Sequence, residues 1–411
     1  MAAATVSDAQ LNRWTLTRQH LVERADLSVV DAVDALAGMQ AQYSISPYVG
    51  LWTRVEGFRR EHLSDALAND EVVKTTVMRG TLHLVTARHL PHYRRAAGSA
   101  YYADTLKRLQ GMEFDLDEIR AHVVAEVAKR THTRIEVAEL IVSRLEGAGE
   151  LPAWVSERPT AIASLAVTND LVNLAEDAAF GYFGGSRYRA APAHAAKPVS
   201  DEDALRHVAT AYLAAFGPAT KADLAQWSGN QVSRFAPVLA ELDDGDELVT
   251  FKADDGRTLI DLKSAARPDD APAPVRLLPK WDNLLLAYAK RTRVLPEAYR
   301  STVIAKNGDV APTILIDGQV AGMWDASPRG KAVLNLRPLT QTMKAKAKKQ
   351  VEAEAEQMLA FLRPDADGAN REVRWAEVER VSVRASAGTA AGPSPTRPAS
   401  GPRTRGGRST P

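Results

Sequence analysis

The chain has 411 residues, more than one hydrophobic core usually organises, so two to four structural units are expected. Apolar residues make up 45% and charged residues 25% of the sequence, which are the proportions of an ordinary globular protein. The absence of cysteine excludes disulfides, thiolate nucleophiles and cysteine-ligated metal sites, whereas a net charge of +1 neither supports nor excludes a nucleic-acid partner.

The N-terminal residues carry no sign of export. The opening MAAATVSDAQLNRW lacks the basic-then-apolar order of a secretory signal. No window of the chain approaches the ~18 uninterrupted apolar residues that a membrane span needs. A reducing cytosol also suits a chain without cysteine. We therefore expect a cytoplasmic protein with no membrane partner.

Residues 8–110 are predicted to form a first winged-helix unit. A short amphipathic pattern at Thr17–Glu23 indicates one helix, and Ser28 is placed to cap a second helix that ends near Gly38. Another short helix is predicted at Leu63–Asn69. The β-branched run VVKTTVMRGTLHLVT then predicts a hairpin. Helices followed by a hairpin are the order of a winged helix-turn-helix.

The pair Gln40-Ala41-Gln42 lies just beyond the predicted end of a helix, in a segment whose serines and proline argue against continued helix. On an extended backbone, side chains at i and i+2 point the same way, so the two amides could converge on one target. Met39, Ala41 and Tyr43 would then face the opposite side. On a helix the two glutamines would diverge by about 200°. The alternative interpretation is a pair of surface glutamines in a loop, and the spacing alone does not decide between them.

The order of helices and hairpin recurs along the chain. Residues 111–198 form the second predicted unit, with helices at DEIRAHVVAEVAKR and VAELIVSRLEG, another around Thr160–Val167, and the turn-rich FGYFGGSRYRA. Residues 199–268 form the third, in which Thr220 caps KADLAQWSG and the turn at Asp254-Asp255-Gly256 marks a hairpin. Consecutive units of this kind imply a tandem array.

Residues 269–384 change to strand-like runs: VRLLP, TVIAKN, APTILID, VAGMWD and AVLNLRPL. A small antiparallel β-barrel or sheet is predicted there. One long polar helix follows at Thr340–Phe361. Residues 385–411 are rich in Gly, Pro, Ser, Thr and Arg and are expected to form a disordered tail. The predicted fold class is mainly α with β (α+β), as tandem winged-helix units followed by this C-terminal domain.

Basic side chains in or beside the predicted wings and third helices are candidates for contact with DNA phosphates, which supply most of a winged helix's affinity. These candidates are Lys74, Arg79, Arg187, Arg189, Arg234 and Arg257. The alternative for each one is a solvated surface cation. Winged helices also mediate protein contacts, so DNA binding is a hypothesis at this point.

Several motifs, in the same order, resemble the AlkZ/YcaQ-type winged-helix DNA glycosylases. They are LNRWTLTRQHL, LAGMQAQYSISPYVGLWTR, MRGTLHLV, ATKADLAQWSG, LLPKWDNLLLAYAKRTRV and ILIDGQVAGMW, and they cover residues 10–365. The Gln-x-Gln form resembles the AlkZ branch, whose enzymes unhook interstrand crosslinks that azinomycin-class agents form at N7 of purines. The resemblance implies that Gln40 and Gln42 take the catalytic positions, and that the winged helices and barrel form a concave channel for double-stranded damaged DNA.

The residue type agrees with a particular substrate class. Glutamine has no titratable proton, so it is neither a general acid nor a general base in the ordinary sense. It can orient a water molecule, which is enough only when the leaving group is already activated. A purine alkylated at N7 is cationic and leaves as a neutral base. We therefore predict a monofunctional DNA glycosylase for N7-alkylated purines, including bulky adducts or interstrand crosslinks. A crosslinked base cannot swing out of the duplex, so an open channel is expected in place of a deep base pocket.

Further candidates for DNA contact come from the matching segments. Arg79 and His83 lie in MRGTLHLV, and others lie on the barrel side: Lys280, Trp281, Asp282, Asn283, Lys290 and Arg291. His83 could equally be a hydrogen-bonded strand residue, and Trp281 could equally belong to the core. The chain departs from its relatives at Trp281 and Asn283, where phenylalanine and proline are more frequent.

Two other functions compete with catalysis. A winged-helix transcriptional regulator would bind DNA without releasing a base, although regulators usually dimerise on paired half-sites. A protein-interaction scaffold would have no affinity for duplex DNA. No metal site and no cofactor are expected, since His89 and His92 are the closest histidine pair and lack carboxylates at ligand spacing. A monomer fits a chain that holds its repeats within one polypeptide.

Overall fold

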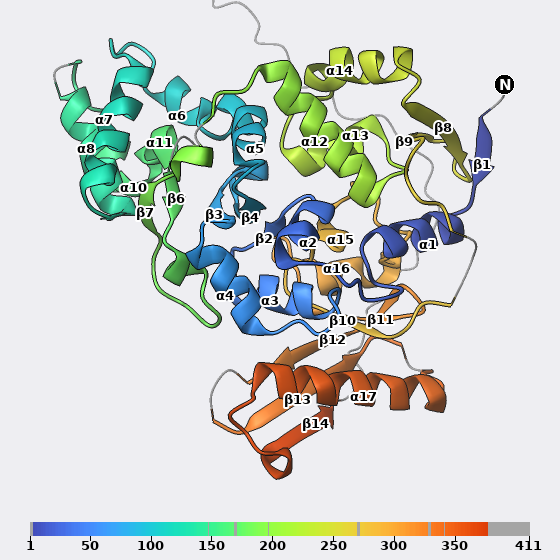
Figure 1. Ribbon diagram of the computed structural model, residues 1–411. Helices are drawn as coiled ribbons and strands as arrows, with labels where there is room; N and C mark the ends of the chain where they lie inside the picture. Colours follow the sequence, from blue (N-terminus) through green and yellow to red (C-terminus); the bar gives the residue numbers. More distant parts are fainter. Residues whose placement is uncertain are drawn as a thin grey trace, which may run out of the picture. The chain divides into compact units, whose positions relative to one another are not determined.

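The computed structural model describes residues 3–376 except 147, 168–170, 196, 269–271, 328–329 and 341. Within this part the fold is a mixture of helices and small sheets (Figure 1). The predicted α+β class is therefore confirmed. The predicted tail at 385–411 lies outside the described residues.

Four helices form the N-terminal part, and serine side chains cap the first two of them. They are α1 (Asp8–Arg18), α2 (Val29–Ala35), α3 (Ile45–Trp52) and α4 (Arg60–Ala68). Ser28 accepts a hydrogen bond from the Asp31 amide, as predicted. The helix predicted at Thr17–Glu23 is wrong, because α1 ends at Arg18 and the chain turns at His20 with φ 53°. α3 was not predicted, because Pro47 argues against a helix. Pro47 lies in the first turn of α3, where the backbone N–H that proline lacks has no partner within the helix.

A three-stranded sheet includes the first residue of the glutamine pair. Its strands are β2 (Met39–Gln40), β3 (Val72–Thr76) and β4 (Leu82–Thr86), in the order β2-β4-β3. The predicted hairpin of β3 and β4 is confirmed. β2 pairs antiparallel with β4 and places Gln40 opposite His83.

The middle of the chain has a core of its own. Its elements are α6 (Ala103–Arg108), α7 (Leu116–Lys129), α8 (Arg134–Leu145), α9 (Ala153–Glu157), α10 (Pro159–Ile162), α11 (Ser164–Val167), β5 (His132–Thr133), β6 (Leu171–Asn173) and β7 (Arg187–Ala190). α5 (Leu90–Ala97) precedes them and contributes its buried residues to a different core. The two long helices predicted here are present as α7 and α8. Their apolar faces pack with α10 and α11 over the β5-β7-β6 sheet.

The next segment shows the predicted three helices and hairpin. They are α12 (Asp201–Phe216), α13 (Lys221–Ser228), α14 (Val232–Asp244), β8 (Leu248–Ala253) and β9 (Thr258–Leu262). Thr220 caps α13 through the Asp223 amide, as predicted. An N-terminal strand, β1 (Ala4–Val6), adds to this hairpin in parallel with β8, and no short-range pattern signals that pairing.

The C-terminal part is a mixed sheet covered by a helix. Its elements are β10 (Arg276–Leu278), α15 (Asn283–Leu286), α16 (Arg300–Val303), β11 (Thr313–Ile316), β12 (Gln319–Ala326), β13 (Ala332–Pro338), α17 (Ala345–Leu362) and β14 (Arg371–Trp375). The strand predicted at TVIAKN is wrong, because its first residues end α16. The sheet runs β10-β11-β12-β13-β14 with open edges, so it is a sheet and not a closed barrel, and β14 is parallel to β13. α17 packs on it (Figure 1).

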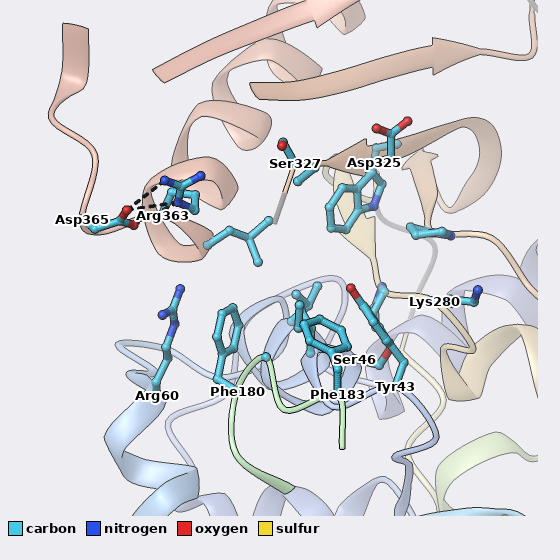
Figure 2. Close-up of a pocket in the computed structure, with 18 of the residues that line it drawn as sticks. Tyr43, Ser46, Arg60, Phe180, Phe183, Lys280, Asp325, Ser327, Arg363 and Asp365 are labelled. Carbon is cyan, nitrogen blue, oxygen red and sulfur yellow. Dashed lines mark hydrogen bonds and ion pairs between the residues drawn. The ribbon is translucent and has the colours of Figure 1, made fainter. Parts of the chain in front are cut away.

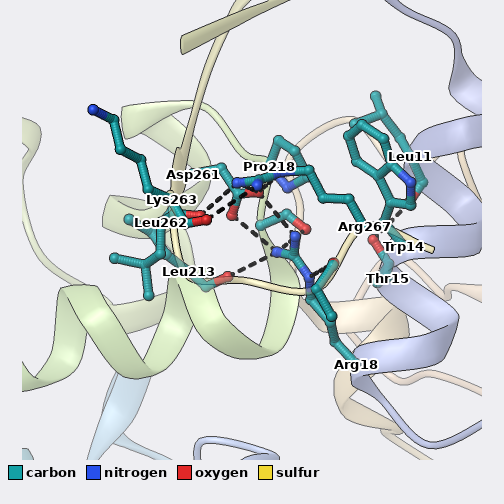
Figure 3. Close-up of polar contacts among 12 residues, drawn as sticks. Leu11, Trp14, Thr15, Arg18, Leu213, Pro218, Asp261, Leu262, Lys263 and Arg267 are labelled. Atoms are coloured by element: carbon teal, nitrogen blue, oxygen red, sulfur yellow. Dashed lines mark hydrogen bonds and ion pairs between the residues drawn. The ribbon is translucent and has the colours of Figure 1, made fainter. Parts of the chain in front are cut away.

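The cores do not divide at the predicted unit boundaries. One cluster joins Val85 of β4 to Leu213 of α12 and to Tyr288 beyond α15. A buried ion pair also links distant segments: Arg18 of α1 binds Asp261 of β9 with both Nη atoms, at 2.9 and 2.8 Å (Figure 3). Contacts between segments far apart in the sequence therefore join the predicted units to one another.

Candidate functional site

The backbone around Gln40 and Gln42 is no longer helical. α2 ends at Ala35, and Gly38 with φ 82° turns the chain into β2. Ala41 donates to the carbonyl of Leu82 at 2.7 Å, which continues the pairing with β4 for one residue. Gln40 is 8% exposed and Gln42 is exposed. The expectation that the helix has ended before the pair is confirmed.

Of the three flanking residues that were predicted to anchor the glutamine segment, two are buried and the third is half-buried. Met39 and Ala41 are buried in a core formed by α2, α3 and α4. Tyr43 is only half-buried and faces the ring of Phe183, with centroids 5.8 Å apart. The buried side chains of Met39 and Ala41 therefore hold the backbone of the segment that carries both glutamines.

Among the described residues, each amide oxygen of the pair has one donor. Gln40 Oε1 accepts from Arg79 Nη2 at 3.1 Å, and Gln42 Oε1 accepts from the backbone N–H of Leu82 at 3.4 Å. An amide oxygen has two lone pairs, so each one keeps a second acceptor position. These contacts orient the amides and leave each able to accept from a further donor.

Arg79 is held in a backbone conformation that non-glycine residues rarely adopt, with φ 55°. Its Nη1 donates to the carbonyl of Trp227 in α13. Gly229, which ends α13 with φ 79°, lies so close that a Cβ there would be 2.8 Å from the Arg79 nitrogen. Burial, and next the charge of Arg291, lower the pKa of Arg79 to about 10. The guanidinium stays charged at neutral pH, and no described carboxylate forms an ion pair with it.

His83 is a neutral imidazole in the interior. Its Nδ1 lies 2.9 Å from the carbonyl of Thr81, and its Nε2 lies 3.4 Å from Arg79 Nη2. Burial and the Arg79 charge lower its pKa to about 3. With Nδ1 protonated towards the carbonyl, Nε2 is an acceptor facing Arg79. This geometry supports the structural interpretation of His83 and makes it a poor carrier of protons.

The segment after β10 reaches the glutamine pair from the C-terminal part. Asn283 Oδ1 accepts from the backbone N–H of Gln40 at 3.2 Å, and its Nδ2 donates to the Gly38 carbonyl. Its neighbour Asp282 is 3% exposed and binds both Nη atoms of Arg54, at 2.9 and 2.8 Å. Asp282 was predicted to contact DNA, but its carboxylate lies inside and holds Arg54. Sequence reasoning missed Arg54, because no local pattern pairs it with a residue so far along the chain.

The other predicted contacts lie apart from this cluster or are already engaged. Arg187 binds Asp177 at 2.6 Å, and Arg234 donates to Asp201 at 3.0 Å. Lys280 pairs with Asp309 at 2.9 Å and lies over the ring of Trp281, which is half-buried. The remaining cations also have partners in the described part: Lys74 with the Asp177 carbonyl, Arg189 with Asp70, Arg257 and Lys290 with Asp255, and Arg291 with the Leu285 carbonyl.

The structure thus brings Gln40, Arg79 and His83 into one hydrogen-bonded group. Asp282, Asn283 and Trp281 share a small recess with Gln40. Among the residues described, no three histidine or acidic side chains are grouped so as to hold a metal ion. None of the described helices has the length and apolar character needed to span a bilayer.

Comparisons with known proteins agree on one family. The sequence model of the family described as DNA glycosylase AlkZ-like matches residues 33–361. An interstrand DNA cross-link repair glycosylase of Streptomyces sahachiroi is 28% identical over 366 residues, which cover 84% of this chain and 94% of the relative. The solved structure of Streptomyces sahachiroi DNA glycosylase AlkZ aligns with a TM-score of 0.70 at 23% identity, over 90% of this chain and 100% of that one. At that identity the structural match shows a shared fold.

Proposed function

This chain belongs to the AlkZ-like DNA glycosylase family, and from that premise we propose that it hydrolyses the N-glycosidic bond of purines alkylated at N7, in bulky adducts and in interstrand crosslinks. The name of its Streptomyces sahachiroi relative, a cross-link repair glycosylase, supports the second substrate class. The carrying observation is the non-helical Gln40-x-Gln42 segment, whose amide oxygens each have one fixed donor and one position left to accept. We propose that these two glutamines are the catalytic pair.

Hydrolysis of this glycosidic bond needs no general acid from the protein. N7 alkylation gives the purine a positive charge, so the base leaves without being protonated. In the proposed step, water oxygen attacks C1′ while the C1′–N9 bond breaks. The bonding electron pair goes to the purine and cancels its charge. The second lone pairs of Gln40 and Gln42 accept from the attacking water, and their dipoles stabilise positive charge on the sugar. The water proton passes to solvent.

Arg79 sets the orientation of one amide. With its oxygen bound to Nη2 of Arg79, the NH₂ group of Gln40 is fixed as well. A guanidinium beside a developing cation would oppose the reaction if it stayed unpaired. A DNA phosphate bound by Arg79 offsets that charge, and Arg79 has no described carboxylate partner to compete. We therefore propose that Arg79 positions Gln40 and contacts the backbone of the damaged strand.

Purified protein and three duplexes test this function. The duplexes carry an N7-methylguanine, a bulky N7 adduct or an N7–N7 crosslink, and alkali-labile abasic sites are counted in each. We expect base release from all three and none from undamaged DNA. Duplex affinity should fall steeply with salt, as phosphate contacts require. A sequence-specific footprint with no base release would instead identify a non-catalytic winged-helix regulator.

A further inference from the structure

A cavity of about 740 Å³ opens beside the segment that follows the glutamine pair (Figure 2). Tyr43, the residue after Gln42, lines one wall together with the start of α3 and the loop at 180–183. The end of β12 and the end of α17 line the opposite wall. A volume of this size suits a drug-sized molecule and exceeds what one nucleobase would fill.

The cavity is lined by aromatic rings. Phe183 is 58% exposed, which is unusual for a large apolar side chain, and its ring faces Tyr43 at 5.8 Å with a tilt of 41°. Figure 2 shows Tyr43, Phe180 and Phe183 along the same wall. Trp324 contributes from the sheet side. Rings exposed in a concave surface offer stacking to a flat, apolar ligand.

One cation in this wall has no acidic partner among the described residues. The guanidinium of Arg60 lies 3.5 Å over the ring of Phe180 and 5.3 Å from that of Phe361. Its Nη2 donates to the Phe361 carbonyl, and its buried Nε has no hydrogen-bond partner. The nearby Asp365 is bound to Arg363 at 2.8 Å. Arg60 lines the cavity, so its N–H groups other than the buried Nε offer donors to a ligand oxygen beside the stacking rings.

The cavity borders the recess beside Gln40. Ser46 and Pro279 line both spaces. A group attached to a purine near Gln42 would therefore reach the ring-lined wall without leaving the protein surface.

We propose that this cavity binds the oxygen-bearing polycyclic arene of a bulky adduct, while the purine to which the arene is attached at N7 lies at Gln40 and Gln42. The proposal rests on the proposed function and names its substrate class. Phe183 and Tyr43 stack on the arene, and Arg60 donates to its oxygen.

Binding of a free arene tests the cavity without any DNA chemistry. The probe is pyrene-1-carboxylate, followed by fluorescence anisotropy with the full chain. We expect Phe183→Ala to weaken binding about tenfold, as the loss of one stacking ring does, and Val232→Ala, an exposed apolar residue of α14, to leave it unchanged. Neutral pyrene-1-methanol should bind less tightly than the carboxylate, since Arg60 then lacks an anionic partner. Equal affinity of wild type and Phe183→Ala would overturn the proposal.

Excision rates separate this proposal from the proposed function. With duplexes carrying either N7-methylguanine or a guanine whose N7 bears a pyrenylmethyl group, Phe183→Ala should slow release of the bulky base about tenfold and leave release of the methylated base unchanged. An equal effect on both substrates, or none on either, would overturn the cavity assignment. No release of either base by wild type would refute the proposed function, and the probe measurement would still decide the cavity.

Discussion

Replacing Asp261 with asparagine should destabilise the protein more than removing Arg267, a second cation that binds the same carboxylate (Figure 3). The side chains of Arg18 and Asp261 are 4% and 0% exposed, and their contacts are bidentate. Asp261→Asn keeps the shape of the side chain and removes its charge, so Arg18 stays buried without a counter-ion. Breaking such a buried pair costs about 3–5 kcal/mol. With an unfolding entropy of ~2.1 cal/mol/K per residue, this loss lowers Tm by roughly 5 °C.

Arg267→Ala is the matched control. Arg267 contacts the same carboxylate at 2.8 Å, but its side chain is 22% exposed and the pair with Arg18 survives its loss. We expect a smaller cost than for Asp261→Asn, because the loss of Arg267 leaves no buried charge without its counter-ion. Calorimetry and urea titration measure both variants, and base release at low temperature should be retained in both. If Asp261→Asn costs no more than Arg267→Ala, the buried pair does not stabilise the fold as argued.

Two further predictions concern the site and its histidines. Gly229→Ala and Gly256→Ala both place alanine at positive φ. At Gly229 the new Cβ would lie 2.8 Å from the Arg79 nitrogen, whereas at Gly256 it would meet open space. Base release should fall in Gly229→Ala and stay unchanged in Gly256→Ala, and equal rates would refute the role of the contact between Gly229 and Arg79. Burial lowers the pKa of His83 and of His207 to about 3, below the ~6.5 of an unfolded imidazole. The neutral folded forms therefore contribute stability that is complete above pH 6.5 and is lost as pH falls towards 3. Urea titrations across this range should show that slope, reduced in His207→Gln, and an unchanged slope in that variant would contradict the assignment.

Local patterns predicted the elements that depend on neighbours in the sequence. Ser28 and Thr220 cap their helices as expected, and the hairpins at β3-β4 and β8-β9 follow from β-branched or alternating residues. The extended conformation at Gln40 followed from the end of α2. In each case the decisive contact lies within a few residues.

Long-range contacts decided the features that were missed. β1 pairs with β8 across most of the chain. Asp282 was predicted to contact DNA beside Lys280, but its carboxylate is buried in an ion pair with Arg54. The hydrogen bond from Arg79 to Gln40 likewise depends on α13, which holds Arg79 through the Trp227 carbonyl. No pattern in a single segment encodes such pairings.

We propose that hydrolysis depends on two uncharged side chains, those of Gln40 and Gln42. Single-turnover release of N7-methylguanine from a duplex, compared between wild type, Gln40→Ala and Gln42→Ala, tests it most directly, with Gln110→Ala as an exposed glutamine elsewhere. Each site variant should be about 100-fold slower, the cost of removing one preorganised dipole, with duplex affinity and the Gln110→Ala rate unchanged. Wild-type rates in both site variants would contradict the claim.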